Sequence, residues 1–228
     1  MNDSLILTEL LNVKSEIKNF IDELYKFANN TNFNLKNEDE AFFRFISKRI
    51  IFFKYILYNK NTYSCKVLIS DFFNLIISIL ENKERYIYLN ERSIIEHYIR
   101  LILDSPSDKS SRELNLFKNL KESYPYIFNE DIYSLIRNEY SIASEFIHGN
   151  EILKNVLVTC FKDFTNNKKS HYNSLNYKNI TNLINHFELA FLYSKTSLID
   201  SAFYRKKYIL EYLKDKDYVK KLNQLKNI

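Results

Sequence analysis

Residues 90–104 read NERSIIEHYIRLILD, and this stretch decides the fold class. At 100° per residue its apolar and polar side chains separate onto two faces of a helix. The apolar stripe is formed by Ile94, Ile95, Tyr98, Ile99, Leu101 and Ile102. The opposite face carries Ser93, His97, Arg100 and Asp104. We therefore expect His97 to point toward solvent, about 140° from Arg92. Arg92 and Glu96 fall between the two faces, at the edge of the buried stripe.

Helical periodicity continues along most of the chain. Only one Gly and two Pro occur in 228 residues, and these residues punctuate hairpins and tight turns, so their scarcity argues against a β fold. We expect an all-α multi-helix bundle that forms a single domain over residues 1–228, because 46% of the residues are hydrophobic and 27% are charged. Helices are predicted at about 4–28, 38–58, 63–81, 90–104, 111–122, 129–148, 151–165, 176–203 and 205–225.

Three features of the sequence bear on where in the cell the protein is located. The start, MNDSLILTELL, lacks the basic and then apolar pattern of a secretory signal. The most apolar run, residues 67–80, is too short to span a bilayer and contains Asp71. Cys65 and Cys160 are isolated in sequence, which excludes a cysteine-based zinc site and fits a reducing compartment. We expect a cytoplasmic protein without membrane contact.

The net charge of +5 is concentrated near the C-terminus. Residues 205–228 hold eight basic and three acidic side chains, so a basic helix is predicted at about 205–225. Lys206 and Lys207 are candidate RNA phosphate contacts, although such a helix also occurs simply as a solvated surface. The segment 42–58, FFRFISKRIIFFKYILY, reads as core and packing surface. Its interleaved cations are a further candidate RNA surface, formed by Arg44, Lys48, Arg49 and Lys54.

A second helix, residues 129–148, also has a polar edge. Its apolar stripe is formed by Ile132, Leu135, Ile136, Ala143, Phe146 and Ile147. One flank carries Arg137, Tyr140, Ser144 and His148, and spacing by four keeps the last three aligned. If the two apolar stripes pack together, this flank meets Arg92 and Glu96 across a groove. A composite polar site is the result.

The segments RSIIE (92–96) and YSIASEFIH (140–148) resemble the HEPN-like helical domains, in particular a bacterial branch found among phage-defence and toxin genes. The resemblance covers about residues 60–155 and implies a helical bundle, usually dimeric, with additional C-terminal helices here. In catalytic members it implies metal-independent cleavage of RNA. Their signature is an Arg followed after four to six residues by a His, which Arg92 and His97 match in spacing. Only a serine, Ser93, follows the Arg, and His148 is the better candidate for the site histidine.

Ribonuclease chemistry gives each residue of this site a role. His148 would exchange protons with the ribose 2′-hydroxyl or the leaving oxygen. Arg92 would stabilise the developing negative charge, and Glu96 would orient one of the two. Tyr140 and Ser144 would bind the phosphate or hold the Arg–Glu pair. Arg137 is a candidate contact to the RNA backbone.

Simpler interpretations stand beside this one. An Arg and a Glu four residues apart form an ordinary helix pair, and a histidine in the last turn is favoured by the helix dipole. Glu145 and His148 have the Glu-x-x-His spacing of di-iron bundles, but no other histidine has a Glu three residues before it. We therefore expect neither metal nor cofactor.

The predicted function is a defence or toxin effector that cleaves or binds RNA through this groove. The alternative is a non-catalytic, dimeric interaction or regulatory module that partners a separately encoded defence enzyme or antitoxin. A homodimer is expected in either case.

Overall fold

The computed structural model describes residues 3–105, 113–148, 158 and 172–226, and these residues form helices and connecting loops without any strand. The all-α fold is therefore confirmed. The helices are α1 (Asp3–Asn30), α2 (Asn37–Asn59), α3 (Tyr63–Leu80), α4 (Glu84–Leu103), α5 (Glu113–Ser123), α6 (Glu130–His148), α8 (Ser174–Ser194), α9 (Thr196–Ala202), α10 (Lys207–Leu213) and α11 (Lys216–Leu225).

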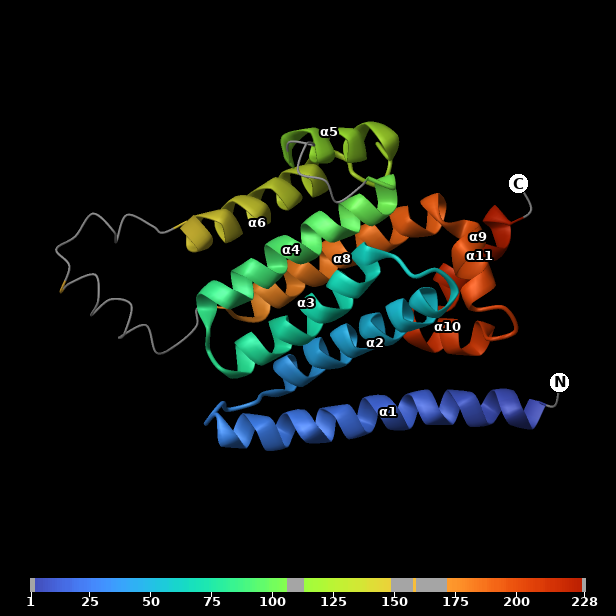
Figure 1. The fold of residues 1–228 in the computed structure, drawn as a ribbon, viewed down its shortest axis with the longest axis horizontal. Coiled ribbons are helices and arrows are strands. Elements are labelled where there is room, and N and C mark those ends of the chain that lie inside the picture. The colour runs from blue at the N-terminus through green and yellow to red at the C-terminus, as the bar shows by residue number, and fades with distance from the viewer. Residues whose placement is uncertain (1–2, 106–112, 149–157, 159–171, 227–228) are drawn as a thin grey trace.

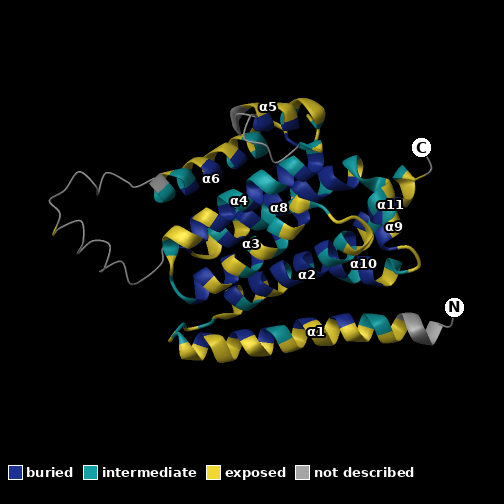
Figure 2. Ribbon diagram, in the orientation of Figure 1, coloured by how far each residue is buried: buried dark blue, intermediate teal, exposed yellow. Residues whose placement is uncertain are grey.

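The centre of the bundle is formed by α2, α3, α4 and α8 (Figure 1). Helices α5 and α6 lie along α4, α1 runs along the outside of α2, and α9 to α11 gather at one end. Most residues of the four central helices are buried or partly buried, whereas α1 exposes one long face (Figure 2). Tyr98 lies in the core, where its ring stacks on Phe187 at 5.3 Å and meets Phe53 edge-on at 5.5 Å. The stretch quoted first thus belongs to a helix packed on α3, α6 and α8.

Asparagine or aspartate follows three helices of this glycine-poor chain in the left-handed conformation. Asn32, Asn82 and Asp104 follow α1, α3 and α4 with φ angles of 56°, 54° and 50°. These two residue types tolerate the left-handed region better than others, because their short side chains bond locally. Helix starts are capped in a similar way, since the Asp215 carboxylate accepts a 2.7 Å bond from the Tyr218 amide. These helices therefore begin and end without glycine.

The helix boundaries differ from the predicted ones at three places. The helix predicted at 90–104 begins earlier, at Glu84. The segments predicted as single helices at 176–203 and 205–225 are each divided in two, at Lys195 and at Lys214–Asp215. The second break has a clear cause, since Lys214 leaves helical geometry to enter the core and Asp215 caps α11. The helix predicted at 151–165 falls outside the described residues, apart from Val158.

By length and composition, α3 is the one helix in the described part of the chain that could cross a membrane. Half of its residues are buried inside the bundle. The helix has 18 residues, close to the prediction of 63–81, and the apolar run at 67–80 forms its C-terminal part.

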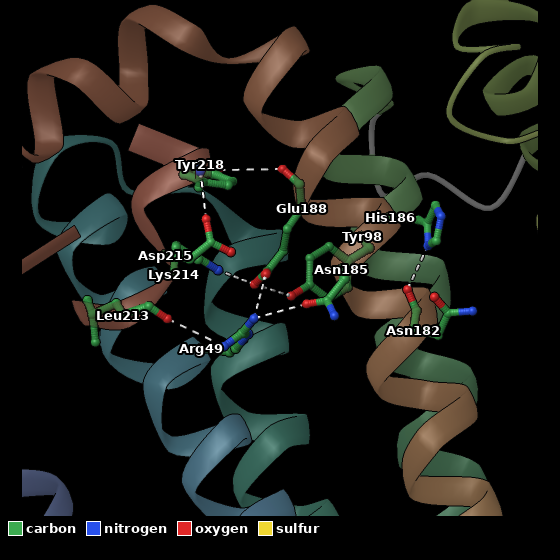
Figure 3. Close-up of polar contacts among 10 residues, drawn as sticks. All are labelled: Arg49, Tyr98, Asn182, Asn185, His186, Glu188, Leu213, Lys214, Asp215 and Tyr218. Atoms are coloured by element: carbon green, nitrogen blue, oxygen red, sulfur yellow. Dashed lines mark hydrogen bonds and ion pairs between the residues drawn. The ribbon is translucent and has the colours of Figure 1, made fainter. Parts of the chain in front are cut away.

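A buried ionic network ties the C-terminal helices to the core (Figure 3). Glu188 of α8 pairs with Arg49 of α2 at 3.2 Å and with Lys214, and all three side chains are less than 10% exposed. Arg49 also donates to the Leu213 carbonyl at 3.4 Å and to Asn185 Oδ1 at 3.0 Å. The Lys214 ammonium lies 3.8 Å from the centre of the Phe52 ring. Two basic side chains thus share one carboxylate in a site without bulk water.

Burial lowers the pKa of Lys214 to about 7, although the Glu188 carboxylate opposes this shift. Between pH 7 and pH 9 the unfolded lysine holds a proton that the folded one has released, so stability rises with pH in this range. We expect the free energy of unfolding to rise with pH in this range because of this group, by about 1 kcal/mol per pH unit. Urea denaturation of wild type and Lys214→Met at pH 7, 8 and 9 measures it. The rise of stability with pH that Lys214 causes should be absent from the variant. Identical pH profiles for the two proteins would contradict a lowered pKa of Lys214.

Candidate functional site

Helices α4 and α6 pack antiparallel and bring three of the five proposed catalytic residues together. The Glu96 Oε1 atom accepts a 2.6 Å bond from the Tyr140 hydroxyl and a 3.0 Å bond from Arg92 Nε. The Arg92 guanidinium lies 4.8 Å from the centre of the Tyr140 ring. One carboxylate oxygen and one aromatic ring therefore set the position of Arg92, an arrangement that orients a guanidinium for an anion.

Neighbouring side chains hold this cluster in place. Phe117 of α5 meets the Tyr140 ring edge-on at 4.9 Å, and Tyr88 stacks on Phe146 at 4.0 Å further along the interface. The side chains of Arg92 and Glu96 are 18% and 21% exposed, so the pair is neither enclosed nor fully solvated. A partly exposed pair remains reachable by a ligand while water screens its charges only in part.

The remaining residues of the predicted site lie along α6. The Ser144 hydroxyl donates a 2.8 Å bond to the Tyr140 carbonyl and so bonds within its own helix. Arg137 is exposed on α6. His148 is the last residue of α6, about 12 Å along the helix from Tyr140, and its side chain lies outside the described part of the chain. The structure therefore joins Tyr140 to Arg92 and Glu96, and leaves the role of His148 a prediction.

The predicted solvent-facing position of His97 is wrong. Its ring meets the Tyr63 ring of α3 at 5.8 Å, and its Nδ1 atom is buried without a hydrogen-bond partner among the described residues. Burial accordingly lowers the pKa of His97. The reason is that α3 covers the face of α4 opposite the apolar stripe, which a helical projection of α4 alone leaves open. His97 thus faces α3, whereas Arg92 faces α6.

Asp71 of α3 is an additional acid near the cluster. Burial raises the pKa of Asp71, a hydrogen bond with Ser93 lowers it, and the charge of Glu96 raises it further. A lone aspartate within the apolar run VLISDFFNLIISIL was the available signal. Polar side chains near Arg92 therefore come from three helices, α3, α4 and α6.

A buried pair of glutamates lies directly behind the predicted site. Glu91 precedes Arg92 and Glu139 precedes Tyr140, and their exposed fractions are 1% and 2%. Glu139 accepts a 2.8 Å bond from Asn179 of α8, and Glu91 shares a hydrogen bond with Glu139. Burial, and then the charge of Glu139, raise the pKa of Glu91 well above its usual value. A proton on Glu91 removes the repulsion between the two carboxylates.

The basic residues predicted to contact RNA are largely engaged within the chain. Lys206 pairs with Glu9 at 2.5 Å, and Lys207 pairs with Asp200 at 2.6 Å. Arg49 and Lys214 are buried in the ionic network, so neither belongs to a basic surface. From the sequence, Arg49 in segment 42–58 and Lys214 in segment 205–228 are predicted to be surface charges. This prediction is wrong, because both side chains are buried.

Among the described residues, no group of three or more His, Cys, Asp or Glu side chains is placed to hold a metal ion. Comparison with protein-family models, curated proteins and solved structures finds no match to this chain. The site is therefore interpreted from its own geometry.

Proposed function

We propose that this chain is an HEPN-like defence or toxin effector that binds RNA at the α4–α6 surface and cleaves it. The observation that carries the proposal is the convergence of Arg92, Glu96 and Tyr140 at a partly exposed edge. Arg92 contacts the scissile phosphate, and Glu96 and Tyr140 fix its direction. Fixed donors of this kind stabilise negative charge that develops during phosphoryl transfer.

In this proposal His148 exchanges a proton with the ribose 2′-hydroxyl or the leaving oxygen, at the C-terminal end of α6. Ser144 and Arg137 contact the backbone on either side of the reacting phosphate. The protein acts in the cytoplasm as a homodimer and requires neither metal nor cofactor.

The second candidate is a non-catalytic interaction module that partners a separately encoded defence enzyme or antitoxin. It is favoured by the bond of the Ser144 hydroxyl to its own helix and by the pairing of Lys206 and Lys207 with acids. Under this alternative the Arg92–Glu96–Tyr140 cluster stabilises the α4–α6 interface and contacts no RNA.

We expect Arg92→Ala to reduce RNA cleavage about 100-fold or more, because a fixed charge on the phosphate is lost. Cleavage of a labelled RNA pool is measured in buffer containing EDTA, together with His148→Ala. The matched control is Lys26→Ala on α1. Lys26 Nζ pairs with Glu23 at 2.6 Å on the exposed side of α1, so an ion pair is removed from a surface to which no RNA contact is assigned.

Equal RNA integrity with wild type and all three variants would reject cleavage and leave the interaction module. Loss of activity in Lys26→Ala as well as Arg92→Ala would indicate a general effect on folding, which circular dichroism of each variant checks.

A further inference from the structure

A groove of about 710 Å³ runs between α2 and α8, away from the Arg92 cluster. This volume lies within the range of about 300–1,000 Å³ found for small-molecule sites. Aromatic side chains of α2 and α8 and a row of asparagines on α8 line it, namely Phe42, Phe45, Tyr177, Asn179, Asn182 and Asn185. The asparagines are three residues apart, so they follow one face of the helix.

Two of these amides are oriented by buried charged groups. Asn185 Oδ1 accepts a 3.0 Å bond from the Arg49 guanidinium, which can only donate, so the Nδ2 donor remains for the groove (Figure 3). Asn179 donates its Nδ2 proton to Glu139 at 2.8 Å, so its Oδ1 acceptor remains. Arg49 and Glu139 are themselves buried. The groove therefore presents a donor and an acceptor with fixed directions, about 9 Å apart along α8.

The aromatic side chains are held equally firmly. Phe42 stacks on Tyr177 with ring centres 4.4 Å apart. The Arg49 guanidinium lies 3.7 Å from the centre of the Phe45 ring. Phe42 and Tyr177 are buried against each other, so Phe45, which is partly exposed, is the ring on which a flat ligand can stack. A ligand suited to this lining has such a flat face and an edge with both donors and acceptors. A purely apolar occupant would bury the oriented amides without partners, which is unfavourable.

We propose that the α2–α8 groove binds an unpaired nucleobase of single-stranded RNA. Unpaired bases are recognised by stacking on aromatic rings together with hydrogen bonds to their edges. Lys178 is exposed at the groove and can contact a backbone phosphate, whereas Glu38 repels phosphate from the groove itself. The base therefore lies inside and the backbone outside. This inference rests on the proposed RNA binding and adds a base-recognising site on a different pair of helices.

The test uses an RNA hexamer that carries the fluorescent base 2-aminopurine, whose emission is quenched by stacking. Wild type is expected to quench it, and Asn182→Ala and Phe45→Leu are expected to weaken binding about tenfold. Asn182→Ala is the decisive variant, because Arg49 packs on Phe45 and a change there can affect folding. Asn119→Ala, an exposed residue of α5, is the matched control and should bind as wild type does. Adenosine monophosphate, followed through the asparagine side-chain amide resonances, tests the groove independently of RNA.

Shifts of the Asn182 and Asn185 amides by the nucleotide, with weaker hexamer binding in Asn182→Ala, support the inference. Hexamer binding that depends on Arg92 but is unchanged in Asn182→Ala overturns the groove site and leaves the proposed function standing. A nucleotide that shifts these amides while the wild-type protein binds no RNA rejects the proposed function and leaves the groove as a nucleotide site. Absence of any shift at saturating nucleotide overturns the inference.

Discussion

Replacement of Glu188 by alanine is expected to lower the free energy of unfolding by about 3–5 kcal/mol. Glu188 is the carboxylate that Arg49 and Lys214 share inside the core. Lys214, with a pKa of about 7, is largely uncharged at pH 7.5, but an arginine side chain stays charged at all accessible pH values. Arg49 would thus remain as a buried, unpaired cation. The loss is a large part of the about 5–15 kcal/mol that stabilises a typical protein.

Urea denaturation at pH 7.5 measures this loss, with the midpoint compared at constant slope. Glu40→Ala is the matched control. Glu40 also bonds to an arginine and a tyrosine, but it lies at the surface, so less than about 1 kcal/mol is expected. The triple variant Arg49→Met/Glu188→Leu/Lys214→Met should recover most of the stability, because no buried charge remains. Equal losses in Glu188→Ala and Glu40→Ala would contradict the role assigned to the network.

The second large effect on the free energy of unfolding is expected at Glu91. Its raised pKa means that the folded protein holds a proton that the unfolded chain releases above about pH 4.3. Stability from this group is therefore full at low pH and is lost as the pH rises toward the folded pKa. Glutamine keeps the shape without a titrating proton. We expect Glu91→Gln to gain stability relative to wild type as the pH rises from 5 to 7.

Denaturation of both proteins at pH 5, 6 and 7 tests this prediction. Glu122→Gln, an exposed change on α5, should follow the wild-type profile. Glu139→Gln should flatten the wild-type slope partially, because it removes the neighbouring charge that helps to raise the pKa of Glu91. Parallel profiles for wild type and Glu91→Gln would show that Glu91 is ionised in the folded protein.

Apolar periodicity and the scarcity of glycine were sufficient to predict the helical class, and edge positions on two helices were sufficient to bring Arg92, Glu96 and Tyr140 together. The helix breaks could not be predicted in this way. The chain leaves helical geometry at Lys214 so that its ammonium can reach Glu188, 26 residues earlier in the sequence. Such a tertiary contact has no local signal.

The buried glutamates were missed although a signal was present. Glu91 lies four residues after Ile87 and three before Ile94, within the apolar stripe of α4. Glu139 occupies the same kind of position between Ile136 and Ala143 on α6. A carboxylate at a core position of each of two packed helices predicts a proton-sharing pair. The position of His97, by contrast, had no signal in the sequence of its own helix. Its burial depends on α3, which a helical projection of α4 alone omits.

The ionic network also bears on how the chain folds during synthesis. Arg49 is translated 139 residues before Glu188 and 165 residues before Lys214. At about 5–20 residues per second, the nascent chain exists for roughly 8 to 30 s with this guanidinium unpaired. We therefore expect the packing of α2 around Arg49 to be completed late in folding, once α8 has left the ribosome and Glu188 can pair with this charge.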